Sequence, residues 1–219
     1  MKPFVIGISG SSGAIYGLRL TRVLAELGYD LMLTVTDAAR IVMNEELGMD
    51  VQDLSSPDFL SRLFSPEAVK RIRYYHYKDL LAPMASGSFH TAGMVVMPCS
   101  VSTISQIANG ASQNLLERAA DVTIKERRKL ILVPRETPLS AIHLENMLKL
   151  ARLGVDIVPA SPGFYGMPQR IDDLIDFVVG KVLDLLGVEA ELFKRWKGGQ
   201  ASQPGSLGLF NGVIPRERA

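Results

Sequence analysis

Short apolar runs alternate with longer amphipathic stretches along most of the chain. The runs are continuous, as expected for strands whose two faces are both covered. The stretches between them repeat apolar residues at helical intervals. The predicted strands are Phe4–Ile8, Leu31–Val35, Tyr74–Tyr77, Met94–Met97, Leu130–Val133 and Val155–Val158. The predicted helices are Ala14–Leu27, Asp37–Leu47, Thr103–Ala108, Leu115–Arg127, Ser140–Arg152 and Ile171–Leu186, with two short ones beginning near Ser56-Pro57 and Ser65-Pro66.

This alternation of strand and helix predicts the fold class. Right-handed crossovers between successive strands give an open parallel sheet with helices on both faces. We therefore expect a doubly wound, Rossmann-like α/β fold of the flavoprotein type, with three αβα layers. No repeat or change of composition divides residues 1–197, which we interpret as a single domain. Residues 198–219 are rich in Gly, Ser, Pro and Gln and are predicted to form a tail or an oligomer-contacting arm.

Charge and cysteine content narrow the classes of function. The chain has 219 residues, with 24 Lys and Arg against 23 Asp and Glu, which leaves a formal charge of +1. A dedicated nucleic-acid binder would carry a basic surplus. No apolar run approaches the ~18 residues that cross a bilayer. The one cysteine, Cys99, allows no intramolecular disulfide and is expected to be a buried packing thiol, which favours a cytoplasmic protein.

Polar residues follow four of the predicted strands. Ligands of open parallel sheets bind beyond the carboxyl ends of the strands, so these segments are expected to converge on one site. The segments are Ser9–Gly13, Thr36, Pro98–Thr103 and Pro134–Glu136. No metal is expected there, because His76, His90 and His143 lack the spacing of metal ligands.

The first of these segments is a glycine-serine turn between a strand and a helix. Glycine allows the backbone to approach a ligand closely, and the free N–H groups of a helix N-terminus attract an anion. The spacing Gly7-x-x-Gly10-x-x-Gly13 differs from the dinucleotide fingerprint, and the next strand ends at Thr36 with Asp37 one residue late. A mononucleotide is therefore favoured over NAD. A plain tight turn explains the pattern of this one segment equally well.

Two further segments add hydroxyl groups and charge. Ser100, Ser102 and Thr103 suit a phosphate, although capping of the following helix explains them as well. Arg135 and Glu136 directly follow a buried strand, where charge is costly unless it is paired or used. By the residues alone, Arg118 could form a surface ion pair on its helix and Lys125 could lie on a solvated face.

Taken together, the motifs of the chain resemble those of the UbiX-type flavin prenyltransferases. They occur in the same order between residue 5 and about residue 196, and jointly they are highly specific. The shared motifs are Gly7-Ile8-Ser9-Gly10-Ser11-Ser12-Gly13-Ala14, Ala85-Ser86-Gly87-Ser88, Pro98-Cys99-Ser100, Glu117-Arg118-Ala119-Ala120-Asp121-Val122, Lys125-Glu126-Arg127-Arg128, Val133-Pro134-Arg135-Glu136-Thr137-Pro138, His143-Leu144 and Phe164-Tyr165.

The resemblance implies an enzyme that joins the dimethylallyl group of dimethylallyl phosphate to N5 and C6 of reduced FMN. The product, prenylated FMN, serves a UbiD-type decarboxylase. The reaction needs no metal. Members of this family form large homo-oligomers, typically dodecamers, with active sites at subunit interfaces.

The resemblance also assigns roles to individual residues. Ser12 and Glu46 resemble the pair that handles the protons at flavin N5 and C6, and Glu136 resembles the acid that protonates the leaving phosphate. The residues implied to bind FMN are Gly10, Ser11, Ser12, Thr36, Ser100, Val101, Ser102, Thr103 and Arg135. The residues implied to grip the prenyl phosphate are Arg118, Lys125, Tyr165 and Lys181, with Lys125 also counted as catalytic.

Two positions depart from the family pattern. Lys181 stands where many relatives have arginine, and a lysine lacks the bidentate fork of the guanidinium. Leu80-Leu81 occupies the stretch where some relatives have a tryptophan over the prenyl group. The first departure bears on binding of the phosphate donor and the second on aromatic stabilisation of the allyl cation.

Two other functions stay open at this point. A flavin-dependent cysteine decarboxylase would share the broad fold, but its catalytic histidine and Asn-rich motif are not visible near the matching turns. A non-catalytic FMN carrier would keep the two turns and leave Lys125 and Glu136 as surface charges. Direct decarboxylation of an aromatic acid is disfavoured, because no decarboxylating chemistry is apparent.

Overall fold

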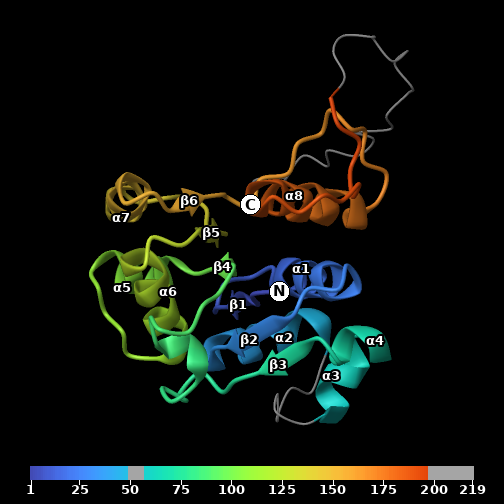
Figure 1. Ribbon diagram of the computed structural model, residues 1–219. Coiled ribbons are helices and arrows are strands. Elements are labelled where there is room, and N and C mark those ends of the chain that lie inside the picture. Colours follow the sequence, from blue (N-terminus) through green and yellow to red (C-terminus); the bar gives the residue numbers. More distant parts are fainter. Residues whose placement is uncertain (49–56, 197–219) are drawn as a thin grey trace.

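A computed structural model describes residues 1–48 and 57–196 of the chain (Figure 1). Its centre is a sheet of six parallel strands in the order β3-β2-β1-β4-β5-β6. This is the strand order of the doubly wound dinucleotide-binding folds, in which the direction of winding reverses between β1 and β4. The strands are β1 (Phe4–Ile8), β2 (Leu31–Val35), β3 (Ile72–Tyr74), β4 (Gly93–Cys99), β5 (Leu130–Pro134) and β6 (Asp156–Ile157).

Helices cover both faces of this sheet and give the three layers that the sequence predicts (Figure 1). One face carries α1 (Ala14–Glu26), α2 (Asp37–Leu47), α3 (Pro57–Leu63), α4 (Pro66–Val69) and α8 (Ile171–Leu186). The other carries the 3-10 turn η1 (Pro83–Ala85), α5 (Val101–Ala108), α6 (Leu115–Lys125) and α7 (Ala141–Arg152). We call these the α1 face and the α6 face.

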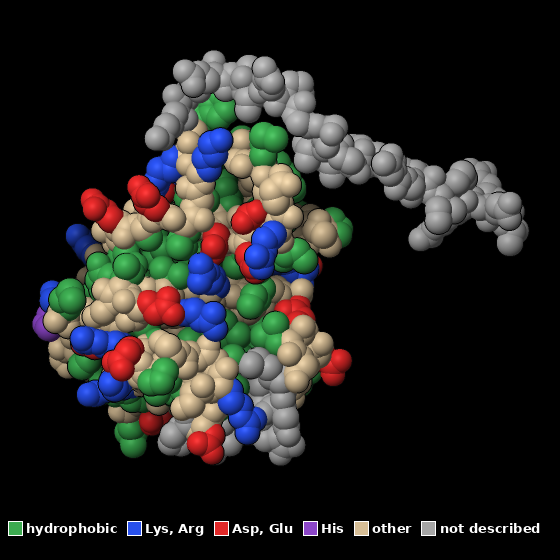
Figure 2. Space-filling model, turned by 90° about the vertical axis from the view of Figure 1, so that its right-hand side faces the viewer, with side chains coloured by type: hydrophobic (Ala, Val, Ile, Leu, Met, Phe, Trp, Pro, Cys, Tyr) green, Lys and Arg blue, Asp and Glu red, His purple; other side chains and the backbone are tan. Residues whose placement is uncertain are grey.

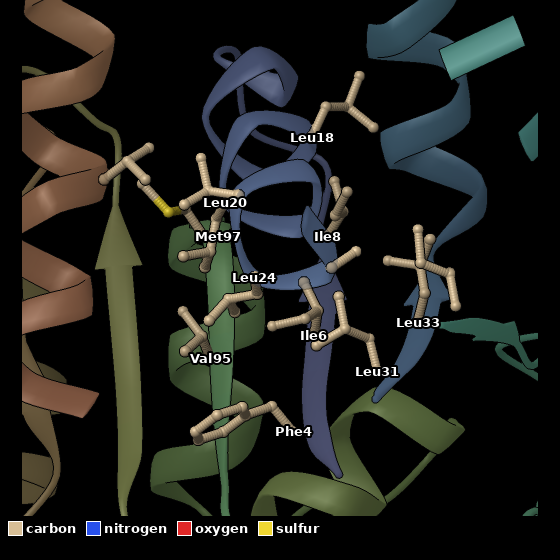
Figure 3. Close-up of a cluster of buried hydrophobic side chains, with 14 of the residues drawn as sticks. Phe4, Ile6, Ile8, Leu18, Leu20, Leu24, Leu31, Leu33, Val95 and Met97 are labelled. Carbon is tan, nitrogen blue, oxygen red and sulfur yellow. The ribbon is translucent and has the colours of Figure 1, made fainter. Parts of the chain in front are cut away.

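Alternate residues of each strand supply the two cores. Figure 3 shows Ile6 and Ile8 of β1 packed with residues of β2, β4 and α1 on the α1 face. Val5, which precedes Ile6 and points to the opposite face, belongs to the core on the α6 face with Met32 of β2. Because both faces are buried, every residue of β1, β2, β4 and β5 is apolar or small, which is why these strands read as continuous runs.

Side chains at the strand ends cap the helices that follow. The hydroxyl of Thr36 accepts a hydrogen bond from the N–H of Ala39, 3.1 Å away, and Ser100 accepts one from Thr103 at 3.2 Å. Asn114 and Ser140 begin α6 and α7 in the same way. These caps satisfy N–H groups that a helix leaves unpaired, so they fix where each helix begins.

Several predicted boundaries are wrong by a few residues. The strand predicted at Tyr74–Tyr77 lies at Ile72–Tyr74, because the chain is already leaving the sheet at Tyr75. The helix predicted from Thr103 begins at Val101, since Ser100 is its cap. The helices predicted to end at Leu27 and Arg127 end at Glu26 and Lys125, and the strand predicted at Val155–Val158 spans Asp156–Ile157.

Candidate flavin-binding site

The turn between β1 and α1 is held tightly against α2. A Cβ atom added at Gly10 would lie 2.4 Å from the Cβ of Ala38, far inside van der Waals contact, so this position has room for glycine alone. Gly13 has a φ of 96°, a left-handed conformation that other residues rarely adopt. Between them the side chain of Ser12 is exposed and Ser11 is buried. The turn therefore presents Ser12 at the carboxyl edge of the sheet.

The carboxylate of Glu46 lies on the same turn. It accepts hydrogen bonds from the N–H of Gly13, at 3.0 and 2.9 Å to its two oxygens, and from the N–H of Ala14 at 3.2 Å. The positive end of the α1 dipole stabilises the ionised carboxylate there. A glutamate near the end of α2, 33 positions further along the chain than Gly13, is thus placed beside Ser12. The two residues assigned to flavin protons by resemblance are neighbours in space.

The turn after β4 is tied to the first turn through Ser9. The Ser9 hydroxyl donates to the carbonyl of Pro98 at 3.1 Å and accepts from the N–H of Ser100 at 2.7 Å. The same residue also donates its N–H to the carbonyl of Pro98. Behind the turn, the Ser100 hydroxyl donates to Thr103 Oγ1 at 3.0 Å, which leaves Ser102 as the exposed hydroxyl and Val101 half-buried. The two turns, Ser9–Gly13 and Pro98–Thr103, form one continuous surface, which we call the flavin ledge.

Arg135 joins the end of β5 to this ledge. Its Nε donates to the carbonyl of Ser12 at 3.1 Å, across 123 positions of sequence. The terminal nitrogens of this guanidinium have no partner among the described residues, so they are free to donate to a ligand. The next residue, Glu136, is exposed, and from the described residues it accepts only the N–H of Thr137, at 3.0 Å.

The end of β2 contributes an ionic cluster as well as Thr36. The Tyr77 hydroxyl donates to the carboxylate of Asp37, and Lys78 and Arg40 lie within ion-pair distance of it. The hydrogen bond from Tyr77, helped by these cations, holds the pKa of Asp37 below its ordinary value. Asp37 is therefore ionised and occupied by protein groups, which leaves no free carboxylate at this strand tip for a ribose diol.

Cys99 lies at the end of β4 but takes no part in this chemistry. Its side chain is fully buried, and burial raises the pKa of the thiol far above its ordinary value. A thiol that stays protonated is a poor nucleophile. The interpretation of Cys99 as a packing residue is confirmed.

The residues assigned to the prenyl phosphate fall into two groups. Arg118 and Lys125 lie on α6. The Arg118 Nε donates to the carbonyl of Ala85 at 3.1 Å, and another of its nitrogens pairs with Asp121 at 2.8 Å. Lys125 pairs with Glu126 and lies against Gly87. Since α6 leads into the amino end of β5 five residues later, Lys125 lies toward the edge of the sheet opposite the flavin turns.

Tyr165 and Lys181 lie on the other side of the sheet. Tyr165 packs against Phe177 of α8, with ring centroids 5.6 Å apart, and against Trp196 at 6.1 Å. Lys181 lies 3.9 Å from Asp184, which makes a two-point contact with Arg195 at 3.0 and 2.7 Å. Figure 2, which looks onto the side that carries α1 and α8, shows basic and acidic side chains interspersed.

One chain therefore assembles part of the predicted site. Ser12, Glu46 and Arg135 meet through direct hydrogen bonds, and the second turn joins them through Ser9. Within the described ranges, no hydrogen bond, ion pair or ring contact links Arg118 and Lys125 to Tyr165 and Lys181, and the two pairs belong to opposite faces of the sheet. Leu80 and Leu81, at the place of the family tryptophan, are exposed.

Sequence reasoning missed several residues that build the site. Ser9 was grouped with the turn, but its role in bridging β1 to β4 depends on the strand order. Asp121 and Gly87 occur in the shared motifs without an assigned role and Asp184 occurs in none, although each lies against a candidate cation. For Asp121 and Asp184 the sequence does contain a signal. Each lies three residues after its cation, Arg118 or Lys181, which is the spacing of an ion pair on a helix.

The donor set of the ledge fits a flavin mononucleotide. Exposed hydroxyls, a helix N-terminus and a guanidinium with free N–H groups match the phosphate and the polar edge of the isoalloxazine ring. Within residues 1–48 and 57–196 no group of three His, Cys, Asp or Glu could hold a metal ion. In the same part of the chain no helix is both long and apolar enough to cross a membrane.

Comparison with known proteins first identifies the class of protein to which the chain belongs. Residues 1–183 match the family model described as Flavoprotein, so the chain belongs to the flavoproteins of this fold. Peptidyl-cysteine decarboxylase EpiD has the same fold at 16% identity and a TM-score of 0.54.

Much higher similarity connects the chain with one branch of this class. It is 51% identical over 193 residues to the flavin prenyltransferase UbiX of Halalkalibacterium halodurans, covering 88% of this chain and 92% of the relative. A crystal structure of AnUbiX in complex with FMN and dimethylallyl pyrophosphate superposes with a TM-score of 0.79 at 36% identity, covering 91% and 99% of the two chains. A dodecameric FMN-dependent UbiX-like decarboxylase from Escherichia coli O157:H7 gives a TM-score of 0.78 at 39% identity, covering 90% and 100%. The chain belongs to the UbiX flavin prenyltransferase family.

Proposed function

We propose that this protein transfers the dimethylallyl group of dimethylallyl phosphate to reduced FMN. One observation carries the proposal: Glu46 of α2 and Arg135, the residue after β5, both make direct hydrogen bonds to the Ser12–Gly13 turn that follows β1. That assembly brings together the hydroxyl and the carboxylate that the reaction requires, beside a guanidinium free to hold FMN. The prenylated product is passed to a UbiD-type decarboxylase, and the enzyme works in the cytoplasm.

The residues of the ledge bind and orient the flavin. The hydroxyls of Thr36, Ser100, Ser102 and Thr103, the backbone of Gly10 and Ser11, and Arg135 hold it. Ser12 and Glu46 handle the protons of flavin N5 and C6, since a hydroxyl can donate a proton and a carboxylate can accept one. When bound, reduced FMN supplies the two nucleophilic atoms, N5 and C6, to which the five-carbon group becomes attached.

Five further side chains act on the donor. Breaking the allylic C–O bond leaves negative charge on the phosphate, which Arg118, Lys125 and Lys181 stabilise electrostatically and Tyr165 binds. Glu136 protonates the phosphate as it departs, because a phosphate leaves more readily as its acid. Exclusion of water protects the allyl cation from hydrolysis.

We further propose that this donor site is completed by a second copy of the chain. Within one copy the cations lie on opposite faces of the sheet, and Lys125 lies toward the edge away from Ser12. Stacking of subunits that brings the α6 face of one copy to the carboxyl edge of another would unite them. A symmetric oligomer repeats such a contact in every subunit, and we propose a homo-dodecamer.

The direct test of this proposal is to measure transfer of the prenyl group to FMN. The full chain, loaded with FMN and reduced under anaerobic conditions, is mixed with dimethylallyl phosphate or diphosphate and the flavin is analysed by mass. We expect a flavin heavier by one prenyl unit with the monophosphate. If folded, FMN-loaded protein yields no adduct with either donor, the proposal is wrong.

The variant Glu136→Gln separates the enzyme from a mere FMN carrier. We expect transfer to slow by about 10²-fold or more, the usual effect of losing a general acid, while FMN binding is preserved. The matched control is Glu145→Gln, which removes an exposed carboxylate from α7 and should change neither. A carrier has no transfer activity to lose. A cysteine decarboxylase would instead reduce its flavin when given a peptidyl or pantothenoyl cysteine.

A further inference from the structure

A hollow lies at the edge of the sheet opposite the flavin turns. Its volume is about 280 Å³, and it opens where β1, β2 and β3 begin. It is lined by Pro3, Asp30, Leu31, Met32, Lys70, Arg71, Arg73, Tyr75, Pro83 and Phe89. None of these residues takes part in the proposed prenyl transfer, so the hollow is separate from that site.

The hollow exists because, in the part of the chain that the structure describes, no helix covers the α6 face at β3. Arg73 is paired in register with Met32, and both point to the face on which Met32 joins the core. The segment from Tyr75 to Phe89 lies beside the edge strand β3 there, and Tyr75, Pro83 and Phe89 of this segment line the hollow. A recess therefore remains between the sheet and this segment.

The walls of the hollow are fixed by the backbone. Arg128 donates to the carbonyls of Phe89, at 2.7 Å, and Gly87, at 2.6 Å, which holds the segment in place. The N–H of Tyr75 donates to the carbonyl of Leu33 at 2.8 Å. Tyr75 and Phe89 both pack against the core of the α6 face while lining the hollow. Such a pre-formed recess with two aromatic walls suits a flat apolar ring.

The charge of the hollow is positive and one cation is uncommitted. Arg71 pairs with Asp30 at 3.0 Å, and Lys70 pairs with Glu67 at 2.9 Å. Arg73 has no acidic partner among the described residues. A planar guanidinium with five N–H donors matches the two oxygens of a carboxylate or the oxygens of a phosphate.

We propose that this hollow binds a small planar aromatic anion, with the ring between Tyr75 and Phe89 and the anionic group on Arg73. A volume of about 280 Å³, just below the roughly 300–1,000 Å³ of drug-sized ligand pockets, limits the ligand to one ring or two small ones. The same chemistry is offered by an aromatic carboxylate and by an aromatic phosphate ester. Benzoate and phenyl phosphate are the probes that distinguish these two sources.

Calorimetric titration of the FMN-loaded full chain tests the site. We expect benzoate or phenyl phosphate to bind, and benzamide and acetate, which lack the charge or the ring, to bind more weakly. The variant Arg73→Gln should weaken anion binding about tenfold or more, as loss of a charge-assisted contact does, and leave benzamide unaffected. The matched control, Arg152→Gln, removes an exposed arginine from the end of α7 and should leave every affinity unchanged.

Two further variants locate the binding. Phe89→Leu keeps the hollow apolar but removes a ring, and should weaken benzoate and benzamide alike. Lys125→Gln alters the proposed donor site and should leave benzoate binding intact. The proposal is overturned if neither probe binds, if Arg152→Gln weakens binding as much as Arg73→Gln, or if Lys125→Gln abolishes binding that Arg73→Gln preserves. Failure of prenyl transfer would not affect these outcomes, because no turnover is measured.

Discussion

The flavin ledge and the cations assigned to the prenyl phosphate are distributed differently in the fold. Ser12, Glu46 and Arg135 come from three distant segments, yet direct hydrogen bonds join them within one chain. Lys125 and Lys181 lie on helices of opposite faces, each paired with an acidic neighbour on its own helix or next to it. The carboxyl edge of a parallel sheet gathers strand ends automatically, whereas helix surfaces diverge from it. We infer that the fold alone builds the flavin site and that assembly builds the donor site.

Complementation between subunits gives the largest expected effect. Lys125→Ala and Lys181→Ala should each lower kcat/KM by about 10²-fold or more, the cost of removing one preorganised charge. Co-expression of the two variants should restore activity, because about a quarter of randomly mixed interfaces then combine an intact Lys125 with an intact Lys181. Activity is measured per FMN bound.

The control for this experiment is a pair of changes on one face. Co-expressed Lys125→Ala and Arg118→Ala subunits place both defects on α6, so no mixed interface is repaired and activity should stay low. If the mixture of Lys125→Ala and Lys181→Ala is as inactive as either variant alone, both residues act from the same chain and the comparison is wrong.

Close packing of the flavin ledge gives the next effect. Gly10→Ala places a methyl group 2.4 Å from the Cβ of Ala38, and such overpacking costs about 1–3 kcal/mol. The turn must move away from α2, so we expect FMN affinity to fall about tenfold, measured by flavin fluorescence. Prenyl phosphate binding to the FMN-loaded fraction should be unaffected, since the donor residues lie elsewhere.

Ala38→Gly supplies the matched change on the other side of this contact. Alone it should cost about 0.5–1 kcal/mol of stability as a helix glycine, with FMN affinity kept. Combined with Gly10→Ala it removes the nearest clashing atom and should restore much of the lost affinity. Equal affinity of Gly10→Ala and the parent protein would show that the turn has room that the structure does not give it.

Lys181→Arg tests the donor side by a conservative change. A guanidinium can bind a phosphate through two parallel hydrogen bonds, which an ammonium cannot. We expect KM for dimethylallyl phosphate to fall a few-fold, with kcat and FMN affinity little changed. Lys194→Arg, an exposed lysine in the segment after α8, is the control. A rise in KM would mean that this site is shaped for the smaller lysine head.

The sequence predicts the strands and the flavin turns well and the donor site poorly. Residues 4–8 and 31–35 are confirmed because burial on both faces leaves a continuous apolar signal. Glu46 at the end of α2 carries no local mark of its role, since only the fold places it on the α1 N-terminus, and the family resemblance supplied it. Which face carries Lys125 depends on the strand order, a long-range property that no local pattern encodes. The tail predicted at 198–219 lies outside the described residues, and the single-domain boundary at 197 stays a prediction.

The smallest effect concerns the ion pair beside Lys181. The hydrogen bonds from Arg195 hold the pKa of Asp184 below its ordinary value. Because the pKa of Asp184 is lower in the folded than in the unfolded protein, the ion pair adds its full stabilisation at pH values above the unfolded pKa of about 3.9. That stabilisation is lost as the pH falls through the lower pKa of the folded protein. Arg195→Gln should therefore lower the thermal midpoint slightly near neutral pH, and the difference from the parent should vanish once the pH lies below the lowered pKa of Asp184 in the folded protein. Arg195→Lys, which keeps the charge, should retain most of the dependence on pH. Arg195 also stacks on Phe193, at 5.3 Å, so a difference that persists unchanged in acid would assign its stabilising effect to that contact instead of to Asp184.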